Sequence, residues 1–128
     1  MPAMEGIRLA ASDKTPGVVF DPVSGTWEIS GCSIHENADR FFIPLIDQAE
    51  HYAKQPAKRT VIRIALSYFN SSTAKYLLDL LRALDEIHAT GKGSVHLEWQ
   101  FEEGDLDTME AGEDYKGLLE MPVKLVER

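Results

Sequence analysis

Apolar residues recur along the chain with two different periods, and each period predicts a different element. In residues 94–101, SVHLEWQF, the side chains of Val95, Leu97 and Trp99 alternate with polar ones. A period of two predicts a strand with one apolar face and one hydrated face. Residues 60–66, TVIRIAL, are instead mostly apolar and rich in β-branched side chains, which predicts a buried strand.

Two longer segments place apolar residues three and four positions apart, which is the spacing of an amphipathic helix. The first covers residues 37–55, with Asn37 as its expected N-cap. Pro44 lies inside it, and we expect a kink or a division there because proline lacks an amide proton. The second begins at Ser72 and ends before Gly91. Its apolar side is formed by Ala74, Leu77, Leu78, Leu81, Leu84 and His88.

The remaining predicted elements are shorter. Residues 17–30, GVVFDPVSGTWEIS, predict a hairpin whose turn contains Asp, Pro and Gly, three residues that favour turns. A third helix is predicted over residues 106–119 and a last strand over residues 122–126. Strands that alternate with helices favour an α/β fold. We expect a single-layer mixed β-sheet with the helices packed mainly on one face, because residues 94–101 have a hydrated side.

The composition is that of a folded protein, and its charge narrows the kinds of partner. At this length we expect residues 1–128 to form a single domain. The formal net charge is -8, from 21 acidic residues against 13 lysines and arginines. This charge disfavours nucleic acid and an anionic membrane as partners, and it favours a protein or a cation. Residues 98–114 contain no Lys or Arg, so we expect them to form an acidic surface.

The cysteine content and the hydropathy of the chain indicate in which cellular compartment the protein resides. Cys32 is the only cysteine, so no disulfide can form within the chain. The first ten residues, MPAMEGIRLA, lack the basic start and the apolar stretch of a signal peptide. No apolar run is long enough to span a bilayer. We therefore expect a cytoplasmic protein.

No group of residues in the sequence indicates catalysis, a metal site or a cofactor. The four histidines do not lie at metal-site spacings from carboxylates or from Cys32. These histidines are His35, His51, His88 and His96. A small enzyme that uses carboxylates or histidines remains an alternative. It would require an enclosed pocket with at least two convergent titratable groups.

A cluster of hydroxyl side chains stands before the leucine-rich helix, in the segment SYFNSSTAKYLLDLL, residues 67–81. If residues 60–66 form a strand, then SYFNSS forms the turn between that strand and the helix. Asn and Ser are common at helix starts because they cap unpaired amides, and capping is the simplest explanation of the cluster. The same unpaired amides and the helix dipole would also stabilise a phosphoryl group on one of the hydroxyls.

Three segments together resemble the SiaC family of bacterial regulatory phosphoproteins, and the similarity runs nearly end to end. They are TPGVVFDPVSGTWEISGCSIHENADRFFIPLI, YFNSSTAKYLLDLL and EAGEDYKGLLEMPVKL. The most specific features are ISG followed by ENA and a Phe-rich helix, YFN followed by hydroxyls, and EAGED. The chain departs from the family pattern at Ile34 and His35, where relatives tend to have Tyr-Pro.

The resemblance implies a fold like that of STAS domains, the class of anti-sigma factor antagonists, and a function in signalling. In the family, the hydroxyl residue directly after the Asn is reversibly phosphorylated, and this position is occupied here by Ser71. The resemblance implies a cognate serine/threonine kinase and a PP2C-like phosphatase as partners. It also implies that the unmodified form binds and activates a diguanylate cyclase, in cyclic-di-GMP regulation of the biofilm type. The protein would then be a switch and not an enzyme, without a cofactor.

Several alternatives stay open from the sequence. Tyr68, Phe69, Asn70 and Ser72 are candidate partner-binding residues, although the first three could equally hold the fold together. Ser72 or Thr73 could be modified in place of Ser71. An alternative function is a partner switch of the anti-sigma factor antagonist type, which controls transcription. The least specific alternative is that the hydroxyl cluster only caps a helix.

Overall fold

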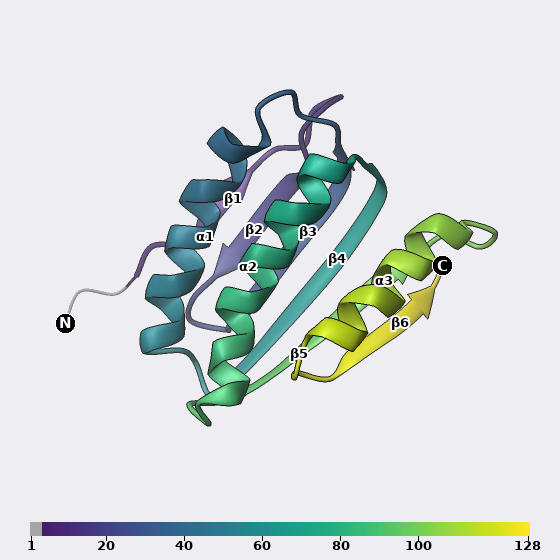
Figure 1. Ribbon diagram of the computed structural model, residues 1–128. Helices are drawn as coiled ribbons and strands as arrows, with labels where there is room; N and C mark the ends of the chain where they lie inside the picture. Colours follow the sequence, from purple (N-terminus) through teal and green to yellow (C-terminus); the bar gives the residue numbers. More distant parts are fainter. Residues whose placement is uncertain (1–3) are drawn as a thin grey trace.

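The computed structural model describes residues 4–128, which form a six-stranded sheet with three helices packed against it (Figure 1). The strands are β1 (Ile7–Leu9), β2 (Gly17–Asp21), β3 (Thr26–Ser33), β4 (Arg59–Phe69), β5 (Ser94–Phe101) and β6 (Val123–Glu127). The helices are α1 (Ala38–Lys54), α2 (Ser71–Ala89) and α3 (Leu106–Leu118). Residues 1–3 lie outside the described residues. They belong to the first ten residues, which we expected not to form a signal peptide. Within residues 4–128, no helix is long and apolar enough to cross a membrane.

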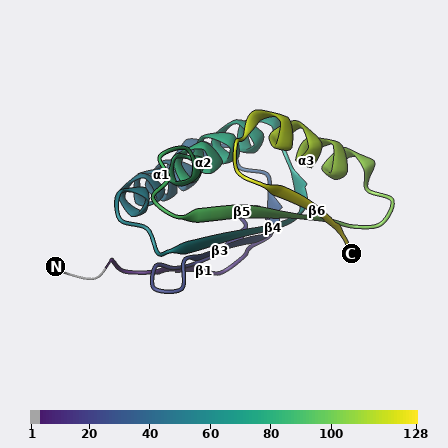
Figure 2. The same cartoon turned by 90° about the horizontal axis from the view of Figure 1, so that it is seen from below.

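The six strands lie in sequence order, from β1 at one edge of the sheet to β6 at the other. β1, β2 and β3 pair antiparallel, which confirms the predicted hairpin, and β3 to β6 pair in parallel. Figure 2 shows that α1, α2 and α3 all cover the same face of the sheet. The predicted mixed sheet with helices on one face is therefore confirmed. Because β3 and β4 are parallel, the chain leaves both strands at the same end of the sheet, where α1 and α2 begin.

The core fills the space between the sheet and the helices. β5 confirms the predicted alternation, since Val95, Leu97 and Trp99 are buried and the residues between them are partly exposed. The largest fully buried side chains are those of Trp27, Trp99, Phe20, Phe42, Ile29, Ile62, Ile64, Leu66, Leu77, Leu80, Leu81 and Leu84. Burial of one such apolar side chain contributes about 1.5–3 kcal/mol, so the helices are held firmly on the sheet.

Two details of α1 differ from the prediction. Asn37 occupies the N-cap position, as predicted, but its side chain makes no capping hydrogen bond. Pro44 does not divide the helix, which runs unbroken from Ala38 to Lys54. Pro44 lies on the exposed side of α1, and so does Arg40, whose carbonyl loses its amide partner to the proline. Water can hydrate that carbonyl, which explains why the helix tolerates the proline.

Two further corrections come from burial. β1 was not predicted, because its three residues IRL are mostly exposed and too few to show a period. His88 was placed on the apolar side of α2, but it is exposed, and Ile87 is buried in its place. The reason is the helical period of 3.6 residues, which carries the apolar stripe from Leu84 to Ile87 and turns His88 away from the sheet.

The carboxylate of Asp85 on α2 fixes the turn that joins α3 to β6. One of its oxygens accepts a hydrogen bond from the amide of Met121 at 2.8 Å, and the other accepts from the amide of Glu120 at 3.0 Å. We expect Asp85→Ala to lower the free energy of unfolding by about 2–3 kcal/mol, because two backbone amides lose a charged acceptor. Urea unfolding measures this effect. The control Asp79→Ala, on the same helix, should change stability by less than about 0.5 kcal/mol, and equal losses in both variants would contradict this role of Asp85.

Candidate functional site

The candidate site is the start of α2, where the chain leaves β4. The prediction that SYFNSS forms the turn is wrong, because β4 continues to Phe69 and only Asn70 connects the strand to the helix. The strand can continue because the pairing of β3 with β4 shifts by one residue: Gly31 pairs with Leu66, and Cys32 pairs with Tyr68. Gly31 has a φ of 106°, a conformation that favours glycine and that permits this irregularity.

Asn70 caps α2 and also ties it to the loop that follows β3. Its side-chain oxygen accepts hydrogen bonds from the Thr73 amide at 3.1 Å and from the Ser72 hydroxyl at 3.0 Å. Its side-chain nitrogen donates to the carbonyl of His35 at 3.2 Å, and its backbone amide donates to the carbonyl of Ser33 at 3.1 Å. The prediction that this cluster caps a helix is therefore confirmed, and the capping side chain is that of Asn70.

Thr73 is not available for modification in this fold, because its side chain is fully buried. Its hydroxyl lies 2.8 Å from the hydroxyl of Ser33, which is also buried, and donates to the Ser33 carbonyl at 3.2 Å. The two hydroxyls join the end of β3 to the first turn of α2. Of the alternatives to Ser71, the structure therefore disfavours Thr73 and leaves Ser72.

We expect Thr73→Val to lower the free energy of unfolding by about 1–3 kcal/mol. Valine has nearly the same shape, but it leaves the buried hydroxyl of Ser33 without its partner. Chemical denaturation of the purified variant measures the loss. Ser71→Ala is the matched control, since Ser71 is exposed and its hydroxyl makes no hydrogen bond among the described residues, so its removal should change stability by less than about 0.5 kcal/mol. A Thr73→Val protein as stable as the wild type would show that the buried pair does not hold α2.

A third contact holds the first turn of α2 from the side of α3. The hydroxyl of Tyr115 donates to the carbonyl of Ala74 at 2.9 Å. Burial raises the pKa of this phenol well above its usual range, and the carboxylate of Asp114 raises it further, so the hydroxyl keeps its proton. The start of α2 is thus tied to β3, to the loop after β3 and to α3.

Ser71 and Ser72 are the two hydroxyl residues of this helix start that remain exposed. Their amides are the first two of α2 and have no acceptor within the helix. The first turn of α2 contains no acidic residue, and the exposed Lys75 follows Ser71 by one turn. A phosphoryl group on Ser71 would therefore lie near the positive end of the helix dipole and one turn from an ammonium group. The arrangement presents a hydroxyl to solvent on a backbone that is fixed from three sides.

The other predicted partner-binding residues lie in different surroundings. Tyr68 is 60% exposed, next to the site, and is free to contact a partner. Phe69 is half-buried, and its ring packs edge-on against Trp99 with centroids 5.9 Å apart. Asn70 is half-buried and uses its side chain as the cap. Partner binding by Tyr68, Phe69, Asn70 and Ser72 stays a prediction. In the structure, Phe69 packs on Trp99, and Asn70 and Ser72 take part in the cap.

The loop before α1 places His35 beside the site. Its ring packs on Phe41 and Phe42, with centroids 4.7 and 5.6 Å away, and burial lowers the pKa of the imidazole. His35 therefore supports the loop whose carbonyl holds Asn70. Within the described part of the chain, no three His, Cys, Asp or Glu side chains are grouped so that they could hold a metal ion.

Sequence reasoning missed the roles of four residues that shape the site. Ser33 and Tyr115 hold α2 from elements far away in the sequence, so no local pattern reveals their role. The motif EAGED, residues 110–114, was the one feature of the sequence that pointed to this region, because Tyr115 follows it directly. Its glycine, Gly112, lies against Trp99 and lets α3 approach the sheet closely. Lys75 was predicted on the polar side of α2, but not in relation to Ser71.

Comparison with known protein families and curated proteins finds similar sequences over most of the chain. Residues 9–128 match the family described as SiaC family regulatory phosphoprotein. A protein of Pseudomonas aeruginosa strain UCBPP-PA14, described as uncharacterized, is 26% identical over 113 residues, which cover 88% of this chain and 89% of that protein.

Solved structures show the same fold. SiaC of Pseudomonas aeruginosa superposes with a TM-score of 0.88 at 24% identity, covering 98% of this chain and 100% of that one. A crystal structure of the diguanylate cyclase SiaD in complex with its activator SiaC, from the same organism, matches with a TM-score of 0.87 at 24% identity. The match covers 95% of this chain and 99% of that one.

Proposed function

The chain belongs to the SiaC family of regulatory phosphoproteins, and from this premise we propose that it is a non-enzymatic switch controlled by phosphorylation of Ser71. In this proposal, the unmodified protein binds and activates a diguanylate cyclase. A cognate serine/threonine kinase adds the phosphoryl group, and a PP2C-like phosphatase removes it. The crystal structure of SiaD with its activator SiaC supports a cyclase as the kind of partner.

The observation that carries the proposal is the exposure of Ser71 on a rigid helix start. A kinase needs an accessible hydroxyl, which excludes the buried Thr73. Ser72 is also exposed, but its hydroxyl donates to the side chain of Asn70 at 3.0 Å and is part of the cap. No hydrogen bond engages the hydroxyl of Ser71 among the described residues, so that hydroxyl is the freer nucleophile. Ser71 also directly follows the asparagine, as the family resemblance requires.

Phosphorylation would change this surface in two ways. It replaces a small hydroxyl with a group that carries a charge of about -1.5 to -2 and three strong acceptor oxygens. These oxygens find donors in the free amides of α2 and in Lys75, so the modified form is well accommodated in the free protein. A partner that packs against Tyr68 and Ser71 would have to strip water from this group and make room for it. The free protein thus stabilises the phosphoryl group, whereas the same group lowers the affinity for the partner.

The proposal is tested with a purified diguanylate cyclase from the same organism as this chain. We expect the purified unmodified chain to increase the rate of cyclic-di-GMP formation by that cyclase, and Ser71→Asp to increase it much less. The replacement Asp79→Asn, which changes one charge elsewhere on α2, serves as a control and should activate like the wild type. If the unmodified chain neither binds the cyclase nor changes its rate, the proposed partner is wrong.

A further inference from the structure

β6 forms one edge of the sheet, and its outer side pairs with no other strand among residues 4–128 (Figure 1). Its pairing with β5 is parallel and regular, and its five residues extend over about 17 Å at 3.3 Å per residue. The opposite edge, β1, has only three residues. Because a very short edge strand resists pairing with another chain, β6 is the edge that can accept a further strand.

The backbone groups of β6 point alternately toward β5 and toward the free edge. Pro122, directly before the strand, directs its carbonyl toward β5, where the amide of Leu97 donates to it at 2.9 Å. Since the direction alternates from residue to residue, the amides and carbonyls of Val123, Leu125 and Glu127 point toward the free edge. These are the donors and acceptors that an added strand would use.

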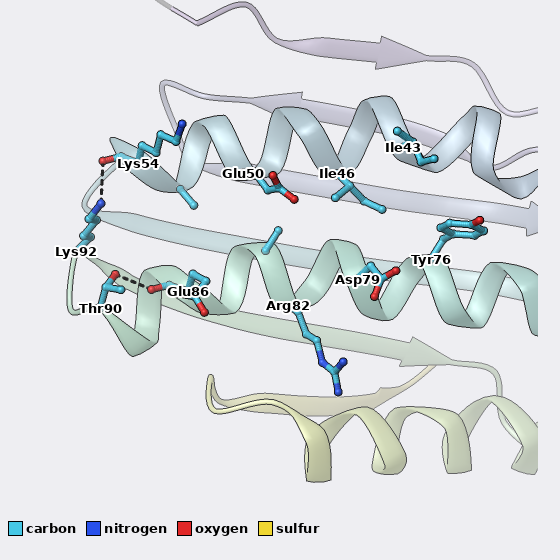
Figure 3. Close-up of a pocket in the computed structure, with 12 residues that line it drawn as sticks. Ile43, Ile46, Glu50, Lys54, Tyr76, Asp79, Arg82, Glu86, Thr90 and Lys92 are labelled. Atoms are coloured by element: carbon cyan, nitrogen blue, oxygen red, sulfur yellow. Dashed lines mark hydrogen bonds between the residues drawn. The ribbon is translucent and has the colours of Figure 1, made fainter.

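The surface around this edge is strongly acidic. Residues 98–128, from the middle of β5 onward, contain ten acidic residues against three lysines and arginines, so they hold -7 of the net charge of -8. Two of the three cations already face a carboxylate. Lys124 stands opposite Glu98 in the sheet, and the guanidinium group of Arg128 lies 3.9 Å from the carboxylate of Glu102. The groove between α1 and α2, by contrast, is lined by three cations and three carboxylates, and its charge favours no particular partner (Figure 3).

Acidic side chains lie at both ends of β6 and on the helix beside it. The exposed Glu120 precedes the strand. The exposed Glu103 lies at the other end, where its amide donates to the carbonyl of Arg128 at 3.2 Å. Figure 2 shows α3 on the helix-covered face of the sheet, on the side of β6. The exposed acidic residues of α3 are Asp107, Glu110, Glu113 and Asp114.

We propose that the free edge of β6 binds an extended basic segment of a partner protein, which adds to the sheet as a further strand. In this recurrent way of binding, backbone hydrogen bonds hold the segment and its side chains give specificity. Lys or Arg residues at the ends of the segment would meet Glu103 and Glu120, and an apolar residue between them would cover the half-buried Leu125.

A second copy of this chain fits the edge less well than a basic segment. Pairing of two β6 edges would bring together two segments that each carry a charge of -7, and like charges repel across an interface. The inference goes beyond the proposed switch, because it does not require phosphorylation of Ser71.

The test uses the full chain and a fluorescein-labelled synthetic peptide of about nine residues, with alternating Val and Thr between paired lysines. We expect saturable binding in fluorescence anisotropy at about 0.1 M salt. In hydrogen exchange measured by NMR, the bound peptide should slow the exchange of the amides of Val123, Leu125 and Glu127, because each gains a carbonyl partner.

Two variants of one residue isolate the backbone contact. Glu127→Pro removes an amide that faces the free edge and leaves the ladder to β5 intact, so it should weaken binding about tenfold. Glu127→Gln loses the same charge but keeps the amide, and it should weaken binding by less than about threefold.

Two double variants isolate the contribution of charge. Glu103→Lys combined with Glu120→Lys should weaken binding about tenfold or more, because attraction becomes repulsion at both ends of β6. The matched control combines Asp47→Lys with Glu50→Lys, two exposed positions on α1, on the other side of the helix layer (Figure 2). It should change affinity by less than about twofold. Thermal unfolding verifies that each variant is folded.

Four results would overturn the proposal. Absence of saturable binding would show that the edge does not accept a basic strand. Equal weakening by the two double variants would show unspecific attraction to an acidic protein. Equal affinities of Glu127→Pro and Glu127→Gln, or slowed exchange only on α3, would show that the peptide does not pair with β6. A doubled mass in light scattering that Glu127→Pro returns to the monomer would assign the edge to a second copy of the chain.

Discussion

Phosphorylation of Ser71 is expected to weaken the binding of the proposed cyclase partner about a hundredfold, which corresponds to about 3 kcal/mol. The cost arises because a doubly charged group must lose its water at a surface that otherwise presents a small hydroxyl. The backbone cannot move the phosphate aside, since Asn70, Thr73 and Tyr115 hold the start of α2 from three directions. Titration calorimetry with the purified chain, before and after kinase treatment, measures the change in affinity.

Two variants separate Ser71 from its neighbour in this measurement. Ser71→Ala should bind the cyclase like the unmodified wild type, and kinase treatment should leave its affinity unchanged. Ser72→Ala should bind normally and still lose affinity after kinase treatment. If kinase treatment weakens Ser71→Ala as strongly as the wild type, then another residue controls binding and the assignment of Ser71 is wrong.

Gly112→Ala is expected to lower the free energy of unfolding by about 3 kcal/mol, because α3 leaves no room for a side chain at this position. A Cβ there would lie 2.6 Å from Cδ2 of Leu125 and 2.7 Å from Nε1 of Trp99. Trp99 is fully buried and its Nε1 donates to the carbonyl of Thr108 at 2.8 Å, so the ring cannot turn away. The helix would have to lift from the sheet, and the bond between Tyr115 and α2 would weaken. Thermal and chemical unfolding measure the loss.

Gly117→Ala provides the control, because it lies in the same helix. No atom lies within 4 Å of a Cβ built at Gly117, and alanine is the better helix former. This variant should be as stable as the wild type, or more stable by up to about 1 kcal/mol. A Gly112→Ala protein with wild-type stability would contradict the close approach of α3 to Trp99.

The elements with a clear hydrophobic period were predictable from the sequence to within one residue. β5 matches its predicted range, 94–101, because three core residues alternate with polar ones over the whole strand. α1 was predicted over residues 37–55 from its helical spacing, and it runs from Ala38 to Lys54. β4 was predicted too short, because the segment SYFNSS was assigned to the turn before α2, and the exposed Ser67 and Tyr68 do not continue the apolar run of the strand. They extend the strand only because β3 supplies partners beyond the irregularity at Gly31, and that contact is not local in sequence.

The candidate site was only partly predictable, for a related reason. The position of Ser71 followed from the resemblance to the family, and the capping role of the cluster followed from its composition. The rigidity of the helix start could not be predicted, because Ser33 is 40 residues from Thr73 and Tyr115 is 41 residues from Ala74. These contacts depend on the order of the strands and on the packing of α3. They also bury the hydroxyl of Thr73, whereas Ser71 and Ser72 remain exposed.

The most direct test of the proposed switch is to locate the phosphoryl group after incubation with the cognate kinase and ATP. Mass spectrometry of the intact and digested protein identifies the modified residue. We predict a single phosphoryl group on Ser71 and no incorporation into Ser71→Ala. Phosphate on another residue of the wild type, or undiminished labelling of Ser71→Ala, would contradict the proposal that Ser71 controls this protein.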